Sequence, residues 1–247
     1  MDFHLLPLIA VAAIFILAGF VKGMIGLGLP TIAIGLLSLF MPPAQAASLL
    51  IAPSLITNLW QLSGPRLLEL SRRLWPMLTG VCVGAWLGGG ILTGANAGRA
   101  VMALGVALIV YALVGLSAIK LSVPRNAEVW AAPLVGIATG FITAATGVFV
   151  LPAVPYLQAI GLDKDDLIQA LGLSFTVSTI ALGAGLLHDG AFETRAALAS
   201  IAVLIPTFIG MYAGQFARER VSPATFRRWF FLGLLALGFY LAARAVS

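Results

Sequence analysis

Residues 19–30 read GFVKGMIGLGLP, which places four glycines, one lysine and one proline inside an otherwise apolar N-terminal region. A related stretch, GFITAATGVFVLP, occupies residues 140–152 and begins with the same Gly-Phe pair. Glycine and proline both disfavour the interior of a helix. We therefore expect a helix to break within each of these two stretches.

The composition of the 247-residue chain is typical of an integral membrane protein. Hydrophobic residues make up 61% and charged residues only 9%, with a mean hydropathy of +1.07. A soluble domain carries about 25% charged residues, because its surface must be wetted. The single cysteine, Cys82, excludes a disulfide scaffold. The net charge is +5, but the sequence contains no run of Lys and Arg residues. We therefore attribute the charge to cytoplasmic loops and not to nucleic-acid binding.

Uncharged segments recur along the whole chain and predict an all-α polytopic protein. A membrane-spanning helix needs about 20 mostly apolar residues. The sequence offers eight to ten such segments, of which Val129–Ile142 and Thr143–Ile160 run together. The other blocks are Leu5–Val21, Gly23–Met41, Ala44–Leu62, Leu74–Thr93, Ala100–Ile119, Leu167–Leu187, Ala196–Ala217 and Trp229–Ala243.

Matching landmarks in the two halves indicate an internal duplication. We expect a first membrane repeat over residues 1–122 and a second over 123–247, together forming one transmembrane domain. The landmarks occur in the same order: Gly26 with Gly147, Ala44 and Ser48 with Ala170 and Ser174, Pro76-Gly80-Gly84 with Pro206-Gly210-Gly214, and Arg99-Gly105 with Arg227-Gly233.

The distribution of basic residues predicts that the two repeats have opposite orientations. If each half crosses the membrane an odd number of times, all but three of the 14 Lys and Arg residues fall on one side. Arg99, Arg195 and Arg244 fall on the other. Four crossings per half would divide the basic residues evenly. Since basic loops stay in the cytoplasm, we expect inverted repeats with both termini outside the cytoplasm.

Inverted repeats with broken helices are typical of secondary transporters, whose substrate sites lie near the middle of the membrane. Unwound glycines and helix N-termini expose N–H groups that bind anions, and hydroxyls add neutral donors. The candidate substrate-binding residues are Lys22, Gly23, Gly26, Gly28, Ser48, Thr143, Thr146, Gly147 and Ser174. The alternative is that the glycines only allow close helix packing and that each hydroxyl bonds its own backbone.

Lys22 and the other polar residues of the segments have two interpretations each. Lys22 either supplies a fixed positive charge near the pathway or extends to the cytoplasmic interface. Asn58 and Gln61 either line a pore or form hydrogen bonds between helices. The Gly80-Gly84-Gly88 ladder and its counterpart Gly210-Gly214 favour close helix packing.

Catalytic and cofactor-binding patterns are missing from the apolar segments. The acidic residues and both histidines lie at the ends of these segments, so we expect no intramembrane proton relay, no metal site and no cofactor. No phosphate-binding Gly-x-x-x-x-Gly-Lys motif occurs. The sequence thus argues against an enzyme.

The glycine-rich stretch with its following proline, its echo in the second half and the overall size resemble the sulfite exporter TauE/SafE family, also known as the toluene-sulfonate uptake permeases. The resemblance covers nearly the whole chain. It implies an inner-membrane transporter of a bacterium or archaeon for sulfur-containing anions such as sulfite or short organosulfonates. The second stretch departs from the first, because Thr143-Ala144 stands where Lys22-Gly23 would be.

Three functions stay open at this stage. We expect an exporter of small sulfur-containing anions, with the lipid bilayer and the anion as its partners. The alternatives are proton-coupled uptake of an organic anion and a membrane scaffold or assembly factor that transports nothing. The sequence leaves open whether the protein forms a homo-oligomer.

Overall fold

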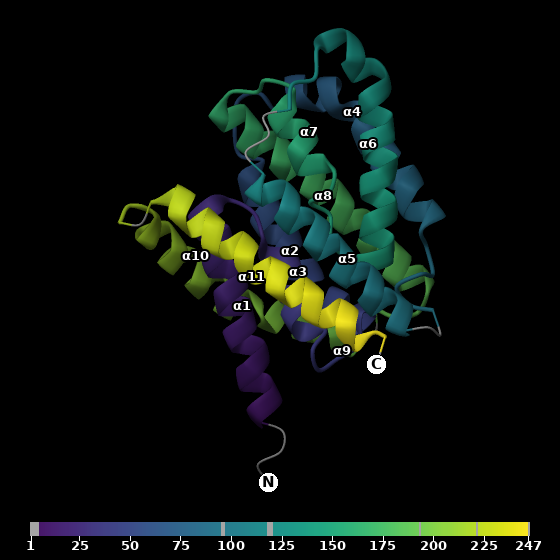
Figure 1. The fold of residues 1–247 in the computed structure, drawn as a ribbon, viewed down its shortest axis with the longest axis vertical. Coiled ribbons are helices and arrows are strands. Elements are labelled where there is room, and N and C mark those ends of the chain that lie inside the picture. The colour runs from purple at the N-terminus through teal and green to yellow at the C-terminus, as the bar shows by residue number, and fades with distance from the viewer. Residues whose placement is uncertain (1–4, 95–96, 118–120, 193, 221, 247) are drawn as a thin grey trace.

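The computed structural model describes residues 5–94, 97–117, 121–192, 194–220 and 222–246, and within these residues the secondary structure is entirely helical (Figure 1). This confirms the predicted all-α class. The helices are α1 (Leu5–Ile25), α2 (Leu29–Leu37), α3 (Pro43–Gln61), α4 (Leu67–Leu87), α5 (Ala97–Leu116), α6 (Arg125–Thr146), α7 (Ala153–Ala159), α8 (Lys164–His188), α9 (Thr194–Ala202), α10 (Leu204–Arg218) and α11 (Pro223–Arg244).

The chain is a multi-pass membrane protein. Among the residues that the structure describes, six helical segments are long and apolar enough to cross a bilayer: Leu8–Ile25, Gly98–Leu116, Arg125–Thr146, Lys164–His188, Thr194–Arg218 and Ala224–Arg244. This is fewer than the eight to ten segments expected. Helices α2 and α7 contain 9 and 7 residues. At about 1.5 Å per residue, neither can cross a hydrocarbon core of about 30 Å. Helices α3 and α4 are longer, but polar residues such as Asn58 and Arg73 lower their hydropathy.

Both glycine-rich stretches break the helix, as the sequence predicted. Helix α1 ends at Ile25, and Gly26 and Gly28 then adopt φ angles of +77° and +101° before α2 begins. Helix α6 is followed by Gly147 with a φ of +73°. Residues other than glycine rarely adopt such angles. The expected block boundaries were misplaced, because α1 continues past Lys22 and α6 continues past residue 142.

The surface of the bundle is far more apolar than that of a soluble protein. Trp86, Tyr212 and Val129 are more than three-quarters exposed. In contrast, Lys22 is 5% exposed and Asn58 is 1% exposed. Large exposed apolar surfaces require an apolar surrounding. The bundle therefore presents its apolar surface to lipid and keeps polar groups inside.

The helices of the two halves pack against each other in a reciprocal pattern. Helix α4 packs on α6, and α1 packs on α10. When α9 and α10, which lie in one candidate span (Thr194–Arg218), are counted as a single helix, the first helix of each half contacts the fourth helix of the other. The fifth helices α5 and α11 pair with each other, as do the third helices α3 and α8. In Figure 1, α11 lies along α5, and α6 crosses in front of α4. Exchanging the two halves leaves this set of pairs unchanged.

Glycines bring the α4–α6 and α1–α10 pairs into backbone contact. A Cβ atom on Gly84 would lie 2.0 Å from the carbonyl oxygen of Ile137 in α6. A Cβ atom on Gly210 would lie 1.9 Å from the carbonyl oxygen of Ile16 in α1. Neither position has room for a larger residue. These contacts confirm the predicted packing role of the glycine ladders.

Two arginines, Arg66 and Arg244, lie beyond opposite ends of α3. Beyond its C-terminal end, Arg66 forms an ion pair with Asp166 at 2.8 Å, and this hydrogen bond raises the pKa of the Arg66 guanidinium. Before its N-terminal end, Arg244 donates a hydrogen bond to the carbonyl oxygen of Leu39. The first turn of α1 and the last turn of α11 both lie toward the lower end of the molecule in Figure 1. Arg66 and Arg244 thus lie beyond opposite ends of α3.

Candidate functional site

The most unusual polar group inside the bundle is the side chain of Lys22 in α1. Its ammonium donates hydrogen bonds to Thr57 Oγ1 at 2.9 Å and to Asn58 Oδ1 at 2.5 Å, both on α3. Asn58 Nδ2 donates in turn to Thr179 Oγ1 on α8 at 3.3 Å. A network of hydrogen bonds therefore joins α1 and α3 of the first half to α8 of the second. We call these four residues the Lys22 network.

No carboxylate compensates the charge of Lys22 within the described residues. The two ion pairs found there are Arg66–Asp166 and Arg73–Glu128. The Lys22 side chain is only 5% exposed and lies inside the bundle, which argues against its interpretation as an interfacial anchor. Buried charges are normally paired, because their desolvation is costly. A small anion beside Lys22 would supply the missing negative charge.

Several unpartnered polar groups lie on α3 and α8, two of the three helices that form this network. Ser54 precedes Asn58 by one turn on α3, and Ser178 precedes Thr179 on α8. Their hydroxyl oxygens are buried and have no hydrogen-bond partner among the described residues, as is also true of Ser174 Oγ and Gln61 Oε1. Unpartnered buried polar groups are rare and call for an explanation such as a bound ion or water. These hydroxyls could donate to an anion held by Lys22.

The first helix break is joined to this region through Gln61. Its Nε2 atom donates to the carbonyl oxygen of Gly26 at 2.7 Å. Gln61 is the last residue of α3, one turn beyond Asn58, and a Cβ atom on Gly172 of α8 would contact it. The left-handed turn at Gly26 is therefore held at the end of α3 that carries the Lys22 network.

The second helix break lies elsewhere, near the opposite end of α3. Gly147 packs against Ile34 of α2 and Ala47 of α3. Ala47 and Gln61 are about 20 Å apart along α3, at about 1.5 Å rise per residue. The two breaks therefore do not lie together, as a single substrate site formed by both of them would require. Instead they lie at the two ends of the α3–α8 pair.

The hydroxyls of the second stretch are bound locally. Thr143 Oγ1 donates to the carbonyl oxygen of Thr139 at 2.7 Å. Thr146 Oγ1 donates to that of Ile142 and accepts from the backbone N–H of Val148. These bonds lie within the helix and at its C-terminal cap, which is a common arrangement for Ser and Thr in helices.

Three further candidates also have structural partners away from Lys22. Ser48 Oγ donates to the carbonyl oxygens of Ala44 and Ala191. A Cβ atom on Gly23 would lie 2.2 Å from the carbonyl oxygen of Met211 in α10, so Gly23 is part of the α1–α10 contact. Gly28 forms the N-cap of α2 and packs against Val21 and Phe230. Of the nine candidates, Lys22 belongs to the Lys22 network, Gly26 is joined to α3 through Gln61, and Ser174 lies on α8, the helix of Thr179.

The sequence analysis did not select Thr57, Thr179, Ser54 or Ser178. A usable signal was present, because Ser54 and Asn58 are four residues apart, as are Ser174 and Ser178. Residues at this spacing share one face of a helix. Polar residues repeated every four positions in apolar helices could thus have indicated two facing polar stripes. A metal-binding group of three or more His, Cys, Asp or Glu side chains is not found in the described parts of the chain.

Comparison with known proteins gives one match. The model of the family described as sulfite exporter TauE/SafE matches residues 11–241, which is nearly the whole chain. No curated protein and no solved structure matches the sequence.

Proposed function

The chain belongs to the sulfite exporter TauE/SafE family and is a membrane transporter, not an enzyme; from this premise we propose that it exports small sulfur-containing anions such as sulfite or short organosulfonates. The observation that carries the proposal is the buried ammonium of Lys22, which has hydroxyl and amide partners but no carboxylate. An ionisable residue inside a membrane protein marks a functional site by default.

The chemistry of the Lys22 network suits an oxyanion. Sulfite and sulfonates present several oxygens around one sulfur, and each oxygen accepts hydrogen bonds. The ammonium would supply the charge, while the unpartnered hydroxyls of Ser54, Ser174 and Ser178 would supply neutral donors. A site with one fixed charge can hold an anion and still release it. This balance is required for transport.

The membrane potential supports the proposed direction of transport. An anion leaving a cell with a negative interior gains about 2.3 kcal/mol per charge per 100 mV. Export therefore needs no proton relay. The Lys22 network consists of Lys, Thr and Asn side chains, and export driven by the potential requires no further group in it.

The proposed architecture is a pair of inverted repeats, residues 1–122 and 123–247, in the inner membrane of a bacterium or archaeon. The reciprocal packing of α1 on α10 and α4 on α6 supports the duplication. The separation of Arg66 from Arg244 supports a cytoplasmic end at Arg66, with both termini outside the cytoplasm. A central site contacted by both repeats is the usual arrangement in such transporters.

Counterflow in proteoliposomes tests this function. Vesicles loaded with unlabelled sulfite or a short sulfonate should accumulate the labelled anion from outside, and an imposed potential should change the rate of net efflux. A requirement for a pH gradient would instead support proton-coupled uptake. Failure to exchange any anion of the panel by a folded, monodisperse protein would refute the proposal and favour a scaffold.

A further inference from the structure

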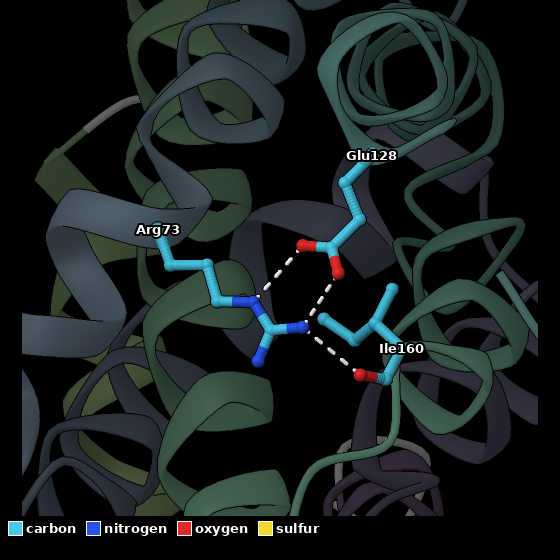
Figure 2. Close-up of polar contacts among 3 residues, drawn as sticks. All are labelled: Arg73, Glu128 and Ile160. Atoms are coloured by element: carbon cyan, nitrogen blue, oxygen red, sulfur yellow. Dashed lines mark hydrogen bonds and ion pairs between the residues drawn. The ribbon is translucent and has the colours of Figure 1, made fainter. Parts of the chain in front are cut away.

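A second polar cluster, separate from the Lys22 network, joins α4 and α6. Arg73 of α4 donates through Nε and Nη2 to the two carboxylate oxygens of Glu128 in α6, at 2.9 and 2.6 Å. Nη2 also donates to the carbonyl oxygen of Ile160 at 2.9 Å (Figure 2). The Nη1 atom of Arg73 has no partner among the described residues, and the side chain is 28% exposed. The guanidinium thus keeps free donors.

An open cavity of about 800 Å³ lies beside this ion pair. Its charged rim consists of Arg73, Glu128 and Arg125, and the remaining lining is mostly apolar, with Trp75, Val129 and Pro133 among its residues. Arg125 is exposed and forms no hydrogen bond or ion pair with another described residue. Because Glu128 is neutralised by Arg73, the rim keeps one positive charge.

The exposed residues around the cavity are of the kind found where a lipid-facing surface meets the polar headgroups. Trp75 and Val129 are both exposed, as is the neighbouring Trp130. Tryptophans gather at the boundary between the hydrocarbon core and the headgroups. Below the cavity, α4 and α6 come into backbone contact through Gly80 and Gly84, and this contact closes the groove.

We propose that this α4–α6 groove binds one anionic phospholipid. Its phosphate would accept hydrogen bonds from Arg125 and from Nη1 of Arg73, and an acyl chain would lie along the apolar wall. The occupant is a lipid because the groove combines a positive rim with an exposed apolar wall. Basic pockets between membrane helices bind anionic headgroups for this reason.

Native mass spectrometry of the purified full-length protein in detergent tests this proposal. Phosphatidylglycerol should bind more tightly than phosphatidylcholine of the same chain length. Arg125→Gln should weaken phosphatidylglycerol binding about fivefold, since one arginine near a charged headgroup contributes on this scale. Thr79→Trp should weaken it without changing any charge, because Thr79 is exposed and lines the cavity.

Arg228→Gln is the matched control. Arg228 is an exposed arginine near the start of another helix, α11, so this variant loses the same charge but should keep wild-type lipid binding. Equal binding of the two lipids would overturn the proposal, as would wild-type affinity in Arg125→Gln. Inorganic phosphate that binds as tightly as the lipid would also overturn it, because the apolar wall would then contribute nothing. The measurement does not depend on transport.

Discussion

The ammonium of Lys22 lies 2.5 Å from Oδ1 of Asn58, so the buried charge of α1 is bonded to a neutral amide of α3. These residues are 36 positions apart in the sequence. The bond holds Lys22 inside the bundle without neutralising it. An amide binds the ammonium but leaves its charge uncompensated, whereas a carboxylate would neutralise it. The proposed substrate site depends on this remaining charge.

Removing the charge of Lys22 should stop transport. Lys22→Met keeps the length of the side chain but loses the ammonium, and hydrogen bonds to charged groups contribute about 1.5–3 kcal/mol. We therefore expect counterflow of sulfite or a short sulfonate to fall by about tenfold or more. Lys22→Arg should retain part of the activity. Lys164→Gln, at the exposed start of α8, is the control and should transport normally; wild-type rates in Lys22→Met would exclude a role for the charge.

Placing a carboxylate beside Lys22 should also stop anion transport, because it would neutralise the ammonium. Asn58→Asp would let the ammonium form an internal ion pair, which leaves no uncompensated charge for a substrate. We expect a folded, monodisperse protein whose anion counterflow is lost. Asn126→Asp makes the same change at an exposed position of α6 and should leave counterflow intact. Unchanged or faster counterflow in Asn58→Asp would contradict the proposed site.

Enlarging a glycine of the α4–α6 contact should destabilise the bundle. A Cβ atom in Gly84→Ala would lie 2.0 Å from the carbonyl oxygen of Ile137, so the two helices would have to separate. Overpacking of this kind costs about 1–3 kcal/mol. Thermal unfolding in detergent should show a lower midpoint. Gly233→Ala in α11 is the matched control, since nothing lies within 4 Å of its added Cβ, and it should be neutral or stabilising by up to about 1 kcal/mol.

Ser200 of α9 should contribute to the stability of the fold, because it compensates for a proline, Pro53, in α3. Pro53 has no N–H to donate to the carbonyl oxygen of Leu49, and Ser200 Oγ donates to that oxygen at 2.9 Å. It also accepts from the N–H of Ala52 at 2.9 Å. Ser200→Ala should lower the free energy of unfolding by about 0.6–1.7 kcal/mol, the range measured for hydrogen bonds between membrane helices.

The double variant Ser200→Ala, Pro53→Ala provides the test of this explanation. Pro53→Ala restores a backbone N–H that can reach the carbonyl oxygen of Leu49, so the loss of the Ser200 hydroxyl should then cost less. Thermal unfolding of the wild type, the two single variants and the double variant gives the coupling energy. Strictly additive effects would show that Ser200 does not compensate for Pro53.

The predictions that succeeded from sequence were local. Gly26, Gly28 and Gly147 adopt positive φ angles, a property that belongs to the residue itself. The helical class and the membrane location follow from the composition of segments of about 20 residues. The number of crossings was less predictable, because α2 and α7 are too short to cross although they lie in long apolar blocks.

The candidate site was only partly predictable, because its members come from helices far apart in the sequence. Lys22 was selected, but its partners Thr57 and Asn58 lie on α3, and Thr179 lies on α8. Thr143 and Thr146 were selected by analogy with the first stretch. They bond their own helix instead, since a helical hydroxyl finds the carbonyl four residues earlier without any tertiary contact.

The sequence by itself determined that this chain lies in a membrane, that its helices break at two glycine-rich stretches, and which family it resembles. Each of these rests on hydropathy or backbone freedom, which neighbouring residues set. Only the tertiary structure decided that Lys22 is buried against Asn58 and that the two breaks lie at opposite ends of α3. The partners of a buried polar group depend on which helix faces fit together, and that fit is a property of the whole bundle.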